Sequence, residues 1–154
     1  MAKHFSHAPL RLEKFFLEEF DGDAGGIVTF VGTPRRLSDG KEIVALEYEA
    51  YEAMAESCLD ELIMKAMRRW SLSGVFLQHC LGRVPVGQAS IIVQVRSPHR
   101  HEAFGASQFL VDGLKREVPI WKSENYADGT NAWVHCEHGV HGVEVEPSFL
   151  QVLK

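Results

Sequence analysis

The chain has 154 residues, 45% of them hydrophobic, and carries a formal net charge of −5. This length and apolar content predict one folded domain, residues 1–154, with a core of its own. The acidic balance argues against broad nucleic-acid binding by phosphate neutralisation, so any anion-binding site must be local. No apolar run is long enough to span a bilayer, and we expect no membrane partner.

Cysteine usage and the N-terminal residues bear on the cellular compartment. The three cysteines, Cys58, Cys80 and Cys136, include no CxxC pair. Residues 1–16 are interrupted by charges and a proline, unlike the unbroken apolar region of a secretory signal. We therefore expect a protein of the reducing cytoplasm.

The first half of the chain predicts a short helix, two strands and a long helix. Residues 10–20 place apolar side chains on roughly one helical face. Residues 26–32 are rich in β-branched and aromatic side chains, and residues 43–51 alternate, so both predict strands. Residues 52–70 have a wide apolar stripe at helical spacing. Its members are Met54, Cys58, Leu59, Leu62, Ile63, Ala66, Met67 and Trp70.

The second half continues the alternation of strand pairs and helices. Residues 74–82 and 89–97 predict two strands joined by the connection 83–88, and a helix is expected over about residues 99–116. The expected inward side chains of that helix are Ala103, Phe104, Phe109, Leu110 and Leu114. Residues 120–126 and 131–137 predict a final strand pair. The hairpin-length connections favour an α+β class with a mixed, mostly antiparallel sheet and about three helices.

Cations gather around the second helix. Pro98 precedes His99 and Arg100 at its predicted start, where free amides and the helix dipole can bind an anion. An imidazole and a guanidinium would add charge-assisted donors. A solvent-exposed helix end explains the same two residues equally well, so both interpretations stay open.

Two lysines and a pair of arginines complete the cationic set. Lys115 lies in the last helical turn, where a cation stabilises the dipole, and Lys122 lies in the strand that follows. Two nearby lysines favour the neutral form of one of them, which can then act as a base or nucleophile. Arg35 and Arg36 follow a strand end, where binding groups commonly lie. Taken singly, each is more simply a surface residue.

Four motifs within roughly residues 25–134 carry a specific resemblance. They are GGIVTFVGTPR, ALEYEAYEAMAE, HCLGRVPVGQASIIVQV and SPHRHEAFGASQFLVDGLKREVPIWKSE. Together they resemble the large, catalytic subunit of molybdopterin synthase. Cys80 and Gln88 depart from that family's usual pattern, which affects details of the pocket or of the partner interface. Residues 137–154 lie outside the resemblance.

The resemblance implies a sulfurtransferase of α/β-hammerhead fold. Such an enzyme is a homodimer with a small ubiquitin-like subunit at each end, a heterotetramer overall. It inserts two sulfurs into cyclic pyranopterin monophosphate, and the sulfur arrives as a thiocarboxylate on the small subunit's C-terminal glycine. Because the partner brings the sulfur, the three cysteines are expected to be structural, and no cofactor is expected.

The resemblance also implies roles for individual residues. Arg35, His99 and Arg100 fall on substrate-binding positions, with Thr33, Pro34, Ser123 and Glu124 beside them as further binding residues. Lys115 and Lys122 fall on the two active-site lysines. We expect Lys115 to be the acid/base or covalent catalyst. We expect Lys122 to orient the thiocarboxylate or to stabilise developing negative charge.

Helix length imposes a geometric condition on that site. A helix over residues 99–116 would be about 25 Å long, so His99 and Arg100 would lie far from Lys115. We therefore predict a composite pocket at a dimer interface, with His99 and Arg100 from one copy facing Lys115 and Lys122 of the other.

The C-terminal residues allow a different interpretation. His135, Cys136, His138 and His141 can bind zinc, but their spacing matches no closed structural site. We therefore predict a polar tail without a metal. Two alternatives to the enzyme remain: a non-catalytic module that docks a ubiquitin-like partner, and a zinc protein built around this tail.

Overall fold

The computed structural model describes residues 4–16 and 22–134. The elements follow one another as β1 (Phe5–Ser6), the 3-10 helix η1 (Leu12–Phe15), β2 (Gly26–Gly32), β3 (Leu37–Ser38), β4 (Lys41–Ala50), α1 (Glu52–Arg69), β5 (Gly74–Cys80), β6 (Gly82–Pro85), β7 (Ile91–Ser97), α2 (Arg100–Glu117), β8 (Ile120–Tyr126) and β9 (Asn131–Val134). No helix within these residues is long and apolar enough to cross a bilayer.

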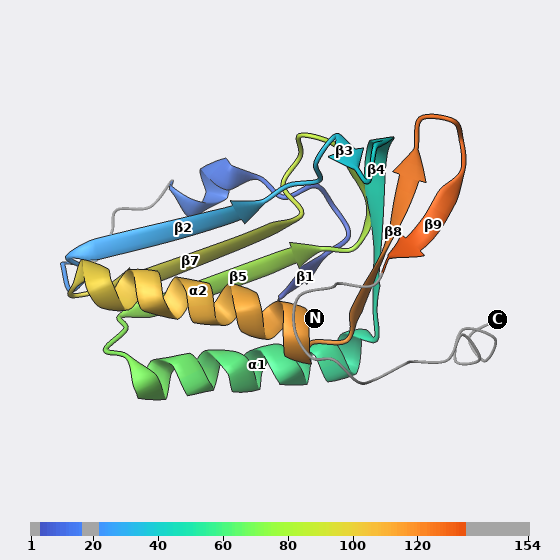
Figure 1. Ribbon diagram of the computed structural model, residues 1–154. Coiled ribbons are helices and arrows are strands. Elements are labelled where there is room, and N and C mark those ends of the chain that lie inside the picture. Colours follow the sequence, from blue (N-terminus) through green and yellow to red (C-terminus); the bar gives the residue numbers. More distant parts are fainter. Residues whose placement is uncertain (1–3, 17–21, 135–154) are drawn as a thin grey trace.

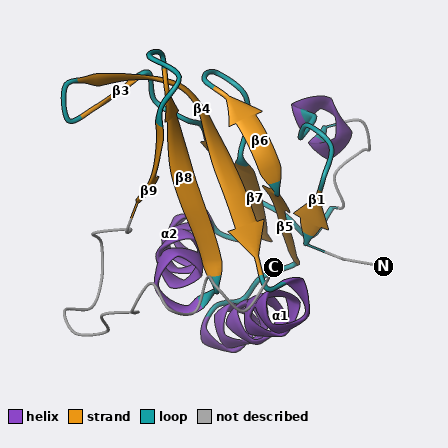
Figure 2. Cartoon of the chain, turned by 90° about the vertical axis from the view of Figure 1, so that its right-hand side faces the viewer, coloured by secondary structure: helices purple, strands orange, loops and turns teal. Residues whose placement is uncertain are grey.

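The strands form two sheets. The first has the order β1-β5-β7-β2, and both α-helices lie along one of its faces (Figure 1). In the second, β4 lies between β8 and β6, with β9 beyond β8 and β3 on β4 (Figure 2). The β1–β5 pair is parallel and every other pair in these two sheets is antiparallel.

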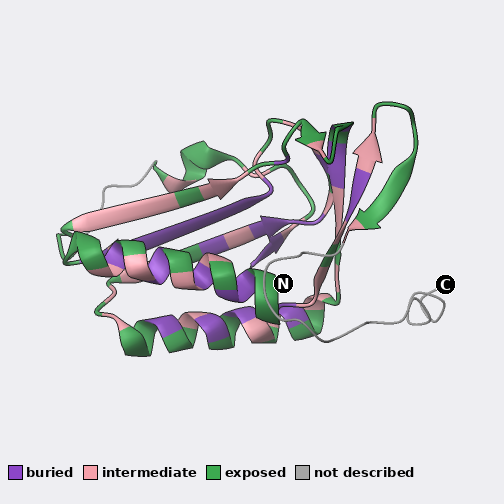
Figure 3. Ribbon diagram, viewed as in Figure 1, coloured by how far each residue is buried: buried purple, intermediate pink, exposed green. Residues whose placement is uncertain are grey.

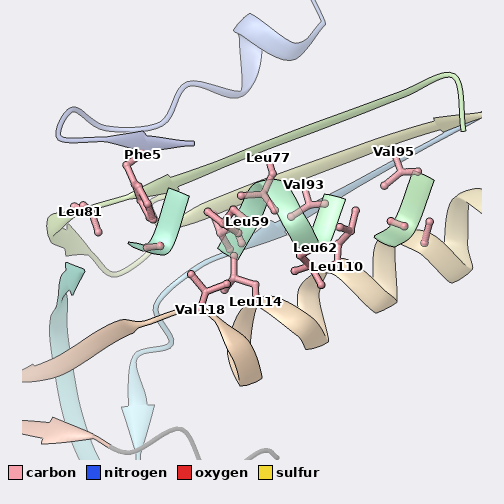
Figure 4. Close-up of a cluster of buried hydrophobic side chains, with 14 of the residues drawn as sticks. Phe5, Leu59, Leu62, Leu77, Leu81, Val93, Val95, Leu110, Leu114 and Val118 are labelled. Carbon is pink, nitrogen blue, oxygen red and sulfur yellow. The ribbon is translucent and has the colours of Figure 1, made fainter. Parts of the chain in front are cut away.

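The core lies between the two helices and the first sheet. Both helices alternate buried and exposed side chains along their length (Figure 3), as an amphipathic helix does when one stripe faces a sheet. Leu59 and Leu62 of α1 meet Leu110 and Leu114 of α2 beneath the strand residues Leu77, Val93 and Val95 (Figure 4). Leu59, Leu62 and Leu110 are fully buried.

A glycine permits close packing of the two helices. A Cβ atom at Gly113 of α2 would lie 2.4 Å from Cδ1 of Leu62. Such a separation is far shorter than a normal carbon contact, so a side chain at this position would push α1 and α2 apart. The last turn of α2, with Lys115, is thereby held against α1 and at the edge of the second sheet.

The α+β class and the mostly antiparallel pairing are confirmed. Strands β2 and β8 have the predicted bounds, and α1 and α2 each end within one residue of the predicted helix ends. The predicted helix over residues 10–20 is wrong as far as the chain is described there. Only Leu12–Phe15 form one 3-10 turn with no buried residue, because no apolar face packs there to support a longer helix. The chain thus has two α-helices in the described part rather than about three.

The predicted helix faces need correction. Phe104 is 63% exposed, and Met54 and Met67 are also exposed, although all three were expected to point inward. The buried stripe of α1 instead runs through Ala55, Leu59, Leu62 and Ala66, and that of α2 is begun by the small residues Ala103 and Ala106. Ala103 and Ala106 face the sheet, and their small side chains let α2 lie close to it. Phe104 is the next residue after Ala103 along the helix, so its side chain points away from the sheet.

Three short strands were not predicted. β6 (Gly82–Pro85) covers half of the connection 83–88, and β1 and β3 have only two residues each. Such short segments show no periodicity, because their pairing is set by long-range neighbours. The expected strand residues 135–137, and His135, Cys136, His138 and His141 with the rest of the tail, lie outside the described residues.

Candidate active site

A cleft of about 890 Å³ lies where the C-terminal end of α2 meets the second sheet. The loop after β2 forms one wall, β4 and β8 form another, and the last turns of α2 close a third side. Phe30, Leu46, Ile91, Leu114, Val118 and Ile120 give the cleft an apolar lining. Polar groups placed on such a lining are partly shielded from water, which strengthens their interaction with a charged ligand.

Three predicted cations share this cleft: Arg35, Lys115 and Lys122. Arg35 is exposed and follows the buried Pro34 in the loop after β2. Lys115 is exposed in the last turn of α2, next to the buried Leu114. The loop after β2 and the α2–β8 segment, which are far apart in the sequence, thus converge on one site.

Lys122 is the most enclosed of the three. It is half-buried on β8, where its cross-strand partners are Tyr48 of β4 and Val134 of β9. Flanking strands on both sides hold the backbone of Lys122 in place, so its ammonium is positioned by a sheet rather than by a loop. Trp121 and Trp133 also border the cleft and are each 46% exposed, so they add aromatic surface to it.

Glu124 supplies the acidic group of the cleft. It is buried, lines the cleft, and accepts a hydrogen bond of 3.0 Å from the Tyr126 hydroxyl. That hydrogen bond, with the nearby carboxylate charge, raises the pKa of Tyr126. Tyr126 therefore remains a protonated donor that holds the Glu124 carboxylate in one orientation.

The other predicted binding residues divide into two groups. Thr33 and Pro34 line the cleft beside Arg35. Ser123 does not line it. Ser123 pairs with Glu47 and Trp133, and strand alternation puts its side chain on the face of β8 opposite Lys122.

His99 and Arg100 lie elsewhere in the chain. They are exposed and line a separate depression of about 490 Å³ at the start of α2, together with Gly25, Pro98, His101 and Phe104. Gly25 allows this corner to close, since a Cβ atom there would lie 2.3 Å from the Pro98 carbonyl oxygen. Arg100 and Lys115 are separated by about 22 Å along the helix axis. Within one chain, the predicted cations therefore form two groups.

Sequence reasoning missed several residues of the cleft, among them His79 and Tyr48. The His79 ring lies 4.8 Å from the Tyr48 ring in an edge-on arrangement. Burial lowers the pKa of His79 to about 4, so the ring is neutral at neutral pH. A usable signal was present: His79 follows Leu77 at strand alternation, which puts a histidine on the buried face of β5.

The described cysteines are both free, and the surroundings of Cys80 do not activate it. Cys58 and Cys80 are free thiols, and burial raises the pKa of the Cys80 thiol. A raised pKa disfavours the thiolate, which is the nucleophilic form. Among residues 4–16 and 22–134, no group of three metal-binding side chains lies together.

A protein-family model decides the relationship of this chain to known proteins. The model for the MoaE protein matches residues 5–117. The chain belongs to the MoaE family. The match includes Arg35, His99, Arg100 and Lys115, and ends before Lys122.

Individual MoaE relatives agree with the family assignment. The molybdopterin synthase catalytic subunit of Nostoc sp. is 40% identical, with 82% of this chain and 78% of the relative covered. Molybdopterin synthase catalytic subunit 1 of Aedes aegypti is 47% identical, with 68% of each chain covered. The crystal structure of molybdopterin synthase from Staphylococcus aureus matches with a TM-score of 0.77 at 28% identity, over 87% of this chain and 97% of that one.

Proposed function

We propose that this MoaE-family chain is the catalytic subunit of a cytoplasmic molybdopterin synthase. In this role it inserts two sulfurs into cyclic pyranopterin monophosphate. The observation that carries the proposal is the convergence of Arg35, Lys115 and Lys122 on one cleft of a chain with a net charge of −5. Such a local concentration of cations suits a small anion and not an extended polyanion.

The cleft matches the chemistry of this substrate. The guanidinium of Arg35 offers planar paired donors to a phosphate, and the Thr33 hydroxyl lies beside it in the same lining. The apolar walls and the tryptophan surfaces suit a flat heterocycle. The Glu124 carboxylate, oriented by Tyr126, adds an acceptor for donor groups of the ring.

The lysines act on the reacting carbons. A small ubiquitin-like subunit presents a C-terminal glycine thiocarboxylate, whose sulfur forms a bond to a carbon of the pterin side chain as an oxygen substituent leaves that carbon. Water then cleaves the bond between the sulfur and the glycine carbonyl, so the sulfur stays on the pterin and the small subunit leaves with a C-terminal carboxylate. Lys115 serves as the acid/base or covalent catalyst at that carbon. Lys122 orients the thiocarboxylate and stabilises the negative charge that develops on oxygen. Since the sulfur comes from the partner, no thiol of this chain takes part.

The separate position of His99 and Arg100 supports a site shared between two copies. Their depression lies at the opposite end of α2 from Lys115, about 22 Å away along the helix. In a homodimer, His99 and Arg100 of one copy face the cleft of the other and contact the substrate phosphate. With one small subunit on each cleft, the assembly is a heterotetramer.

A non-catalytic docking module is the alternative that shares this fold. Docking a ubiquitin-like tail requires an apolar groove with a few hydrogen-bond donors. Two lysines on separate elements, together with an oriented carboxylate, exceed that requirement. The catalytic proposal therefore explains more of the cleft.

Reconstitution tests the proposed function. The protein is mixed with a thiocarboxylated small subunit and cyclic pyranopterin monophosphate, and dithiolene product is measured. We expect product from the wild type, and a loss of at least about 100-fold in rate for Lys115→Ala or Lys122→Ala. Lys65→Ala is the matched control, because Lys65 pairs with Glu117 at 3.0 Å on the surface and does not line the cleft. Absence of product from the wild type would overturn the proposal.

A further inference from the structure

His79 occupies an unusual position for a titratable group. It is only 4% exposed, yet it borders the cleft that holds Arg35, Lys115 and Lys122. Tyr48 contacts its ring edge-on, and the Phe5 ring lies 6.4 Å away on the neighbouring strand. These two aromatic rings from β4 and β1 fix the plane of the imidazole.

One ring nitrogen of His79 is committed to the backbone. Nδ1 lies 2.8 Å from the carbonyl oxygen of Cys80. A carbonyl oxygen can only accept a hydrogen bond, so Nδ1 carries the proton and donates it. Burial lowers the pKa of the ring to about 4, so at neutral pH Nε2 has no proton and is purely an acceptor.

Nε2 reaches the cleft. No described residue forms a hydrogen bond to this atom, and within residues 4–16 and 22–134 no fully enclosed side-chain nitrogen or oxygen lacks a partner. Nε2 therefore touches solvent, and the cleft is the space that the ring borders. Its neighbour Tyr48 is the cross-strand partner of Lys122, so the acceptor lies on the Lys122 side of the cleft.

We propose that His79 is a further substrate-binding residue, whose Nε2 accepts a hydrogen bond from an N–H or O–H donor of the bound pterin. The inference rests on the proposed function of the same cleft. Arg35, Lys115 and Lys122 supply donors for the phosphate and the reacting oxygens but offer no acceptor. His79 would thus join Glu124 as an acceptor for donor groups of the ring. A fixed, uncharged acceptor pairs with a ring donor without attracting the phosphate, so it selects the heterocycle and not the anion.

Two substitutions separate this role from a structural one. His79→Asn retains an amide donor in the position of Nδ1 and removes the acceptor in the position of Nε2. His79→Gln does the reverse. We expect His79→Asn to weaken pterin affinity by about tenfold, seen both in Kd by calorimetry and in KM, with kcat much less affected. We expect His79→Gln to bind within about threefold of wild type although it melts at a lower temperature.

Two comparisons complete the experiment. His4→Asn is the matched control, because His4 is also buried and bonded to a backbone carbonyl, that of Leu77, but does not line the cleft. It should lower the melting temperature and leave the pterin Kd unchanged. Inorganic phosphate, used as a second probe, should bind equally to wild type and to His79→Asn.

The outcomes distinguish this inference from the proposed function. If wild type binds the pterin and His79→Asn binds it equally well, or better than His79→Gln, then the role of His79 is structural and the inference fails while the function stands. If wild type neither binds the pterin nor forms dithiolene, the proposed function fails, and the His79 inference fails with it.

Discussion

Lys115 and Lys122 share a cleft but differ in their surroundings. Lys115 is exposed at a helix end, whereas Lys122 is half-buried between two strands. A lysine on a helix end can move toward a reacting carbon, while one held in a sheet is suited to a fixed electrostatic role. The difference supports distinct tasks for the two.

Single-turnover kinetics test this division of labour. We expect Lys115→Ala to slow the chemical step by about 100-fold or more at saturating pterin. We expect Lys122→Ala to weaken productive binding of the thiocarboxylate tail and to retain more of the chemical rate once saturated. Equal residual rates for the two variants under saturation would remove the reason for ranking them.

His79 also predicts how stability depends on pH. Its pKa is lowered from 6.5 to about 4, so the unfolded chain binds a proton more readily than the folded chain between these values. Stability contributed by the neutral ring is therefore present above about pH 6.5 and is lost as the pH falls toward 4. The full difference corresponds to at most about 3.4 kcal/mol of unfolding free energy.

Urea unfolding at several pH values measures this contribution. Between about pH 7 and about pH 4.5, wild type should lose more unfolding free energy than His79→Asn, which has no titrating group at this position. The other titratable groups are common to both proteins and cancel in the comparison. Parallel pH profiles would show that the ring does not titrate as described.

The sequence motifs predicted Arg35, Lys115 and Lys122 as site residues but did not predict His79. The three cations lie in recognisable loops and element ends, where exposed charge is itself a signal. His79 acquires its significance from Phe5, Tyr48 and Cys80 around it, and Tyr48 is far away in the sequence. Ser123 was predicted as a binding residue because it is next to Lys122 in the sequence. In a strand, however, neighbouring side chains point to opposite faces, so Ser123 points away from the face that carries Lys122.

Among the elements, α2 determines where the charges are. Its 18 residues place Arg100 in one depression and Lys115 in the other, and its packing on α1 fixes both. The fit depends on Gly113, where a Cβ atom would lie 2.4 Å and 3.0 Å from the two terminal methyl groups of the fully buried Leu62. Alanine in the middle of a helix is ordinarily favoured over glycine by up to about 1 kcal/mol.

Gly113→Ala should nevertheless destabilise the protein. We expect a loss of about 1–3 kcal/mol, because forcing a methyl group into a filled core displaces α1 or Leu62. The free-energy cost of that displacement exceeds the gain in helix propensity. Asp112→Ala is the control on the same turn, since Asp112 is exposed, and its effect should stay within about 0.5 kcal/mol. Chemical denaturation measures both. A Gly113→Ala protein as stable as wild type would mean that the two helices are not in close contact there.

Periodicity predicted the long elements and failed for the short ones. β2, β8, α1 and α2 are long enough for alternation or a helical stripe to show, and they were placed almost correctly. Within the described residues 10–16, the expected helix is reduced to one 3-10 turn, because amphipathic spacing without a surface to pack on does not stabilise a helix. β1, β3 and β6 exist through their partners β5 and β4, which local sequence cannot reveal.

At the level of the whole molecule, the predicted binding and catalytic cations divide into two groups, one at the start of α2 and one around its end. A substrate as small as a pterin phosphate cannot reach both groups in a single chain. Two-fold symmetry solves this, because the same two surfaces can face each other across an interface in both directions. We therefore propose that each active pocket is built from two copies of the chain.

A mixed-dimer assay tests the shared pocket. Arg100→Ala and Lys115→Ala are each prepared as inactive proteins, mixed in equal amounts under conditions that allow subunit exchange, and assayed for dithiolene with the thiocarboxylated small subunit. A shared pocket predicts recovery of about a quarter of wild-type activity, because half of the dimers are mixed and each mixed dimer has one intact pocket. A mixture no more active than its two components would contradict the shared pocket.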